Sequence, residues 1–153
     1  MIEPEIFELS ASDAEALTTL LTSAREEYIQ HLHPFPFTVE EIRRRLLANR
    51  ADRWWGLRAE GQLAGFYMLR GWDDGFKRPA FGVFVAEPFA RRGLARRALV
   101  SAVEYCRGSG APAVMLTVHP DNVRARATYE AAGFQLEGEN FATGHLIYQL
   151  PLR

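Results

Sequence analysis

A basic glycine turn is the first stretch whose residue types could do chemistry. It reads RRGLAR over residues 91–96 and follows a short apolar run from Phe81 to Val85. A helix that begins at such a turn presents free backbone N–H groups, and its dipole and the neighbouring arginines add positive charge. Gly93 matters because a Cβ at this position would hold a phosphate away from the backbone. The turn therefore predicts a binding site for a pyrophosphate, called here the pyrophosphate seat.

A second stretch places an asparagine and a tyrosine on one helical face. Asn122 and Tyr129 are seven residues apart, which is two turns of a helix. Taken alone, this pair is an N-cap and a core tyrosine. Taken with the glycine turn, it places a phenol at the mouth of a phosphate site, where it could supply a proton to a leaving group.

A strand–helix–strand unit connects the two stretches. The run Phe81–Val85 predicts a buried strand, apolar residues recur at helical spacing from Leu94 to Cys106, and residues 113–118 predict another buried strand. Such a unit requires a parallel pair with a right-handed crossover. Ligands bind outside the carboxyl ends of parallel strands, so residues 85–95 and 118–122 are expected to meet at one pocket.

The remaining segments predict antiparallel strands and three further helices. Helices are expected from Ser12 and from Thr38, each opened by a capping box, and over residues 122–132. Strands are expected at residues 5–9, 54–59, 62–69, 134–136 and 146–150. The order β-α-α-β-β-β-α-β-α-β-β predicts an α/β fold (an α+β mixed sheet) with helices on both faces and one parallel pair.

The composition is that of an ordinary globular protein. The 153 residues suffice for one domain, and 18 basic against 19 acidic residues give a net charge of −1. This balance disfavours nucleic-acid binding through bulk charge. No apolar stretch is long enough to span a membrane, and the first residues lack the features of a signal peptide, so a cytoplasmic location is expected. Cys106, the single cysteine, lies on an apolar helical stripe and is expected to be a buried hydrophobe.

Both chemical stretches match motifs of one superfamily. The pattern Gln/Arg-x-x-Gly-x-Gly/Ala falls on Ala90–Ala95, and Asn-x-x-Ala-x-x-x-Tyr-x-x-x-Gly-Phe falls on residues 122–134 without a gap. The sequence thus resembles the GNAT superfamily of acyl-CoA-dependent N-acyltransferases. The resemblance implies a GNAT-like fold whose parallel strands splay to hold acyl-CoA, with one N-acetyltransferase domain over residues 1–153. It also implies acetyl-CoA as co-substrate, no metal, and a monomer or homodimer.

The resemblance also assigns residues to the binding of acetyl-CoA. The backbone of Phe84 and Val85 would pair with the pantetheine arm, Asn122 would touch the same arm, and Tyr129 would protonate the departing thiolate. The pyrophosphate would be held by the amides of Arg91, Arg92, Gly93, Leu94, Ala95 and Arg96. Two positions depart from the family pattern: Ala90 replaces the usual Gln/Arg, and Ala131 replaces a basic residue. The contact to the 3′-phosphate would then fall to Arg124 or Arg126.

The acceptor side is less clearly marked in the sequence. An alkyl ammonium must lose a proton before its nitrogen can attack a thioester, and the carbonyl oxygen needs a donor, which in the family is the Val85 amide. His119 is a candidate base, or else a turn histidine before Pro120. Tyr28, His31 and Asp73 are candidates for the acceptor pocket, or else surface residues.

The leading hypothesis is an N-acetyltransferase that moves an acetyl group from acetyl-CoA to a primary amine by direct attack in a ternary complex. Ribosomal-protein N-terminal acetyltransferases of the superfamily often carry a glutamate where this chain has Thr117, so a small-molecule amine is the expected substrate. No nucleic-acid or membrane partner is expected. The alternatives are a protein N-terminal or lysine acetyltransferase and a non-catalytic acyl-CoA-binding module.

Overall fold

The structure is a computed structural model that describes residues 3–30, 32 and 35–152. Seven strands and five α-helices follow one another in the order β1, α1, α2, α3, β2, β3, β4, α4, β5, α5, β6, β7. The strands are β1 Glu5–Glu8, β2 Arg53–Ala59, β3 Gln62–Arg70, β4 Ala80–Val85, β5 Ala113–Val118, β6 Gln135–Glu139 and β7 Leu146–Pro151. The α-helices are α1 Ala14–Thr22, α2 Glu26–Ile29, α3 Val39–Ala48, α4 Leu94–Ser109 and α5 Val123–Ala131.

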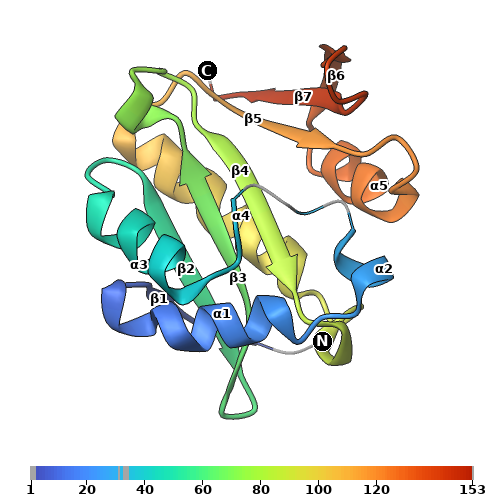
Figure 1. The fold of residues 1–153 in the computed structure, drawn as a ribbon. Coiled ribbons are helices and arrows are strands. Elements are labelled where there is room, and N and C mark those ends of the chain that lie inside the picture. Colours follow the sequence, from blue (N-terminus) through green and yellow to red (C-terminus); the bar gives the residue numbers. More distant parts are fainter. Residues whose placement is uncertain (1–2, 31, 33–34, 153) are drawn as a thin grey trace.

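The strands form one mixed sheet in the spatial order β1-β2-β3-β4-β5-β7-β6. β4 and β5 are parallel, and the other neighbouring strands are antiparallel. In Figure 1, α1 and α3 lie in front of β2, β3 and β4, whereas α4 lies behind them. The expected mixed sheet with helices on both faces is therefore confirmed.

The parallel pair is joined only where its strands begin. One residue pair, Ala80 with Met115, connects β4 to β5, and the Met115 amide donates to the Pro79 carbonyl at 3.0 Å. Beyond this point β4 and β5 diverge, as Figure 1 shows, while β4 stays paired with β3 as far as Val85. The sheet therefore opens between β4 and β5 toward their carboxyl ends.

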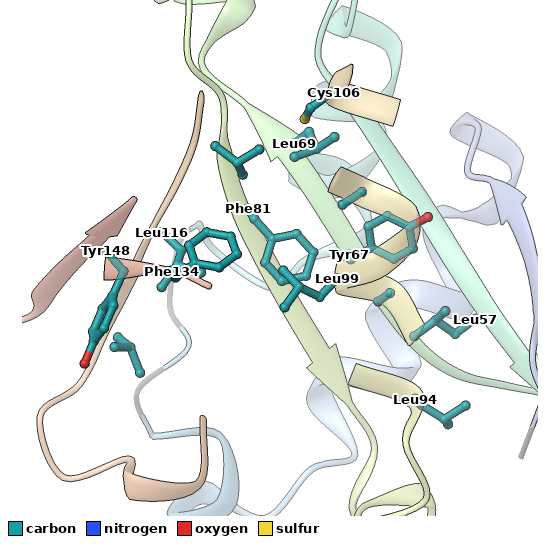
Figure 2. Packing of buried hydrophobic residues seen from close by; sticks show 14 of the residues in the cluster. Leu57, Tyr67, Leu69, Phe81, Leu94, Leu99, Cys106, Leu116, Phe134 and Tyr148 are labelled. Atoms are coloured by element: carbon teal, nitrogen blue, oxygen red, sulfur yellow. The ribbon is translucent and has the colours of Figure 1, made fainter. Parts of the chain in front are cut away.

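Two apolar layers hold the sheet between its helices. Behind the sheet, Leu94, Leu99 and Cys106 of α4 pack on β3 and β4, and Figure 2 shows Phe81 between this group and Phe134 with Leu116. In front, Leu17 and Leu21 of α1 and Ile42 of α3 pack in a second layer with Trp54, Phe66 and Phe84. Cys106 is fully buried, as expected, and burial raises the pKa of its thiol to about 12.

The N-terminal third differs most from the expectation. The capping box is made by Ser10 and Asp13 rather than by Ser12 and Glu15, and it opens a short 3-10 turn before α1. The predicted first helix stops at Thr22 and resumes as α2, because Arg25 adopts an extended backbone. Tertiary contacts that the local sequence does not encode fix α2, including the hydrogen bond from Tyr28 to β4. Thr38 caps α3 as expected, and its hydroxyl accepts from the Glu41 amide at 3.1 Å.

The close approach of β3 to the end of β4 gives a stability prediction. A Cβ on Gly65 would lie 2.4 Å from the Phe84 carbonyl oxygen, which is backbone and cannot rotate away. We expect Gly65→Ala to lower the free energy of unfolding by about 1–3 kcal/mol, measured by urea denaturation. Gly138→Ala is the control, because nothing lies within 4 Å of its Cβ position. Equal effects of the two substitutions would contradict this account.

Candidate functional site

The gap between β4 and β5 is lined by backbone groups that lack a strand partner. The Ala86 amide donates to the Ala64 carbonyl of β3 at 2.8 Å, so the polar groups of residue 86 point toward β3. Backbone polar groups alternate between the two sides of a strand. Those of Val83 and Val85 therefore point toward β5, where the ladder has already ended. A ligand with amide groups can pair with this free edge as an added strand does.

This register corrects one expectation and adds one residue. The Phe84 carbonyl lies on the β3 side, close to Gly65, so the backbone of Phe84 is not available to the gap. Val83 takes its place beside Val85. The sequence marked the apolar run but did not show which residues of the strand turn their polar groups toward the gap.

The glycine turn lies just past the carboxyl end of β4 and ends at the N-terminus of α4. Arg91 and Gly93 both have positive φ, 65° and 85°, so the backbone curls and its successive N–H groups converge. Among the described residues, the amides of residues 91–96 donate no hydrogen bond. The first amide of the helix that donates one is that of Arg97, which bonds to the Gly93 carbonyl. Converging free amides at the positive end of a helix of 16 residues form an anion site.

A groove of about 720 Å³ runs between α4 and α5 on the same side of the sheet. Arg96 and Arg107 line it from α4, and Thr128 and Ala131 line it from α5. Arg126 is not part of this groove. Its guanidinium donates to the Tyr148 hydroxyl and to the Pro120 carbonyl, each at 3.2 Å, and so fixes α5 to the sheet and to the loop after β5.

Tyr129 and Asn122 lie at the α5 side of the gap. Asn122 caps α5, and its side-chain oxygen accepts from the Ala125 amide at 3.2 Å. Tyr129 packs on the rear apolar layer together with Val83 and Val85, and its ring lies 6.0 Å from that of Phe134. Burial raises the pKa of the Tyr129 phenol to about 12, so it is a proton-bearing group at neutral pH. Within the described part of the chain its hydroxyl has no hydrogen-bond partner.

On the front face of the sheet, α2 borders the gap. The Tyr28 hydroxyl donates to the Val85 carbonyl at 2.7 Å, and the Tyr28 ring meets that of Phe84 edge-on. Burial and the nearby Glu87 carboxylate raise the pKa of Tyr28. Arg25 forms a two-point ion pair with Glu87, through Nε at 2.9 Å and a terminal nitrogen at 2.5 Å. These contacts place Tyr28 beside the free edge of β4.

The other expected acceptor-side residues are dispersed. His119 follows β5 at the gap, and its Nδ1 accepts from the Asp121 amide at 3.1 Å. Asp73 lies before the start of β4, at the opposite end of that strand from Val85, and its carboxylate accepts from the amides of Arg50 and Ala51. It therefore anchors the β3–β4 connection and does not line the gap. His31 lies outside the described residues.

Other features of the described residues carry no chemistry related to the gap. A hollow of about 770 Å³, lined in part by Trp72 and Tyr105, lies at the far end of α4 from the glycine turn. No three acidic, histidine or cysteine side chains of the described chain are placed to hold a metal ion. None of the described helices is long and apolar enough to cross a lipid bilayer.

The chain is similar in sequence to proteins of known type. The model of the acetyltransferase (GNAT) family matches residues 15–134. Human N-acetyltransferase 8 is 25% identical over an alignment of 127 residues, and the match covers 74% of this chain and 56% of that protein. The chain thus spans little more than half the length of this curated relative.

Solved structures agree over nearly the whole chain. PaiA N-acetyltransferase from Thermoplasma acidophilum, in complex with coenzyme A, superimposes with a TM-score of 0.79 at 19% identity, over 98% of this chain and 99% of that one. A chimera of spermidine N-acetyltransferase SpeG from Vibrio cholerae and hSSAT gives a TM-score of 0.79 at 20% identity, over 97% of this chain and 95% of that one. The family match covers most of the sequence and the fold agrees with it, so the chain belongs to the GNAT family of acetyltransferases.

Proposed function

We propose that the protein transfers an acetyl group from acetyl-CoA to a primary amine, by direct attack of the amine on the thioester while both substrates are bound. The observation that carries the proposal is a track of backbone groups that, among the described residues, have no strand or helix partner. It runs from Val83 and Val85 in the open sheet, where the Val85 carbonyl accepts from the Tyr28 hydroxyl, to the free amides of the glycine turn. A pantetheine arm ending in a pyrophosphate has its amides and its charge in this same order.

The direction of the track supports a proposed position for the thioester. The pyrophosphate lies at the turn, beyond the end of β4, so the arm runs back along β4 and its sulfur lies farthest from the turn. Val83 is two residues farther from the turn than Val85, which makes the Val83 amide the better donor to the thioester carbonyl oxygen. Val85 then pairs with an amide of the arm. This assignment replaces Val85 as the oxyanion donor, and one backbone N–H aimed at a developing oxyanion contributes about 3 kcal/mol.

The groove between α4 and α5 suits the adenosine end of acetyl-CoA. Arg96 and Arg107 line it together with one carboxylate, that of Glu104. The two arginines supply the positive charge that is missing because Ala131 replaces a basic residue of the family pattern. Arg126 is already bound to Tyr148 and Pro120. We therefore assign the 3′-phosphate contact to Arg96 in preference to Arg126.

Tyr129 is proposed to assist departure of the CoA thiolate. Its raised pKa of about 12 keeps the hydroxyl protonated at neutral pH. A thiol has a pKa of about 8.5, so this phenol does not give up its proton readily to a thiolate. Its main contribution is then a hydrogen bond to the sulfur as negative charge develops there.

Direct transfer is favoured over an acetyl-enzyme route because the chain has no thiol at the gap. Cys106 is the single cysteine of the sequence. It is fully buried on the side of α4 that faces the sheet, and the raised pKa of its thiol, about 12, keeps it un-ionised. A nucleophilic cysteine requires the thiolate and access to substrate. The acetyl group is therefore proposed to pass straight to the amine.

The acceptor is proposed to be a small-molecule primary amine. Thr117 stands where a glutamate would support protein N-terminal acetylation, and one structural neighbour is named as a spermidine N-acetyltransferase. The test is a CoA-release assay across amine drugs, amino sugars, polyamines, amino acids and peptides, with calorimetry of acetyl-CoA binding. Faster turnover of peptides than of small amines would reverse the choice of acceptor. Binding of acetyl-CoA without turnover of any amine would favour a non-catalytic binding module.

The two ends of α4 offer a matched test of the pyrophosphate seat. Gly93 and Gly110 are left-handed glycines with φ of 85° and 81°, at the N- and C-terminal ends of this helix. Alanine costs about 1–2 kcal/mol in this conformation, so Gly93→Ala should weaken acetyl-CoA binding on the order of tenfold by calorimetry. Gly110→Ala should lose similar stability and keep its affinity. If both variants bind acetyl-CoA equally well, the seat is misplaced.

Removal of the Tyr129 hydroxyl should affect turnover and leave binding intact. We expect Tyr129→Phe to lower kcat about 10²-fold with an unchanged dissociation constant for acetyl-CoA. Tyr105→Phe, at the exposed far end of α4, should leave both values as they are. Because the pKa of Tyr129 is about 12, its ionisation should produce no fall in the wild-type rate up to about pH 10. A Tyr129→Phe enzyme with full kcat would remove the hydroxyl from the mechanism.

A further inference from the structure

Two imidazoles meet where β5 ends. His119 directly follows β5 and His145 directly precedes β7, and the last pair of these strands is Val118 with Leu146. Because β5 and β7 are antiparallel, His119 and His145 are the next two residues in register. Their ring centroids lie 5.6 Å apart with the planes at 74°, an edge-to-face contact.

Both rings lie on the front face of the sheet. Val118 and Leu146 pack into the rear layer, under α4 and α5. Neighbouring residues of a strand point to opposite faces, so His119 and His145 point to the front. Tyr28 and Phe84 lie on this front face as well.

The imidazoles are also at the height of the proposed thioester. Ala80 pairs with Met115, and parallel strands advance together. Four residues beyond Ala80 is Phe84, and four beyond Met115 is His119. Counted along the two strands from this pair, the imidazole pair is level with Phe84, and the divergence of β4 and β5 places it on the β5 side of the gap. Tyr28 faces the gap from the β4 side through its bond to Val85.

The two rings differ in their ability to accept a proton. Nδ1 of His119 already accepts the Asp121 amide at 3.1 Å, and the Asp121 carboxylate, at 3.9 Å, is too far to compete for it. In the neutral ring of His119 the proton is then on Nε2, and no lone pair is left for a substrate. Within the described residues neither ring nitrogen of His145 is hydrogen-bonded; only its backbone amide donates, to the Thr143 hydroxyl, and the ring is half-buried. His145 therefore keeps the lone pair that a general base needs.

We infer that His145 is the general base for the amine, with His119 holding its ring in place; this rests on the proposed function. His145 takes one proton from the ammonium of the acceptor. The free nitrogen forms a bond to the thioester carbonyl carbon, the carbon–sulfur bond breaks, and the electron pair leaves with sulfur. The remaining surplus proton on nitrogen passes through solvent to the thiolate, which becomes a thiol, so that the products are the amide, CoA and the one proton held by His145. The proton on His145 returns to solvent.

The pH dependence follows from the need for a neutral base. Among the described residues, the titratable groups near His145 by contact, loop or register are His119, whose ring contacts it, Asp121, on the same loop as His119, and Glu139, which pairs with Leu146. Protonated His145 cannot accept the ammonium proton, so kcat should be low in acid and rise with pH as the ring becomes neutral. The rise should level off once the base is neutral.

The experiment compares His145→Gln, His145→Ala and His119→Gln by CoA release across pH, using an amine that the wild type turns over. Both His145 variants should lose about 10²-fold in kcat, and their residual rate should no longer fall at low pH (the acid limb of the pH profile). Added imidazole should restore part of the rate of His145→Ala. His119→Gln should be slower but keep the acid limb. Phe141→Ala is the control, because this exposed residue lies on the same loop as His145.

Calorimetry of acetyl-CoA binding identifies any variant that has lost its fold. If His145→Gln keeps full kcat or keeps the acid limb, the inference is overturned while the acetyltransferase activity stands. Loss of the acid limb in His119→Gln alone would move the base to His119. A wild type without turnover of any amine would instead defeat the proposed function.

Discussion

The feature on which the site depends is the early end of the ladder between β4 and β5. Backbone N–H and C=O groups inside a protein need partners, and a sheet normally supplies them along the whole strand. Here the pairing of β4 with β5 ends at its first residue pair, and only β3 continues beside β4. The open edge of Val83 and Val85 is therefore a template that an extended ligand with its own amides can complete. The rigid pairing of β3 with β4, tightened by the close approach at Gly65, keeps this edge in position when nothing is bound.

The two faces of the sheet beside the gap have different chemistry. The rear face carries the free amides of the glycine turn, the arginine-lined groove and the phenol of Tyr129. The front face carries Tyr28 and the imidazole pair. A thioester that lies in the plane of the sheet can thus be held from behind and attacked from the front. The two substrates need not pass each other, which agrees with direct transfer.

Most of the fold was predictable because the local signals were consistent with the tertiary structure. The strand–helix–strand unit, the Thr38 cap and the buried position of Cys106 all follow from spacing and residue type. The break between α1 and α2 was not predictable, since it depends on Arg25 and Tyr28 meeting the end of β4. The same holds for Asp73, whose partners at Arg50 and Ala51 are far away in the sequence. At the proposed site, the sequence marked the glycine turn and Tyr129, whereas the proposals for Val83 and His145 depend on the strand register and on the contact between the His119 and His145 rings.

The most direct test of the account is residue-resolved amide hydrogen exchange with and without acetyl-CoA. In the free protein the Phe84 amide, which faces β3, should exchange slowly, while those of Val83 and Val85 should exchange fast. Addition of acetyl-CoA should slow Val83 and Val85 and leave Phe84 nearly unchanged. If Val83 and Val85 are protected in the free protein, or stay unprotected in the complex, the open edge of β4 does not hold the substrate and the account is contradicted.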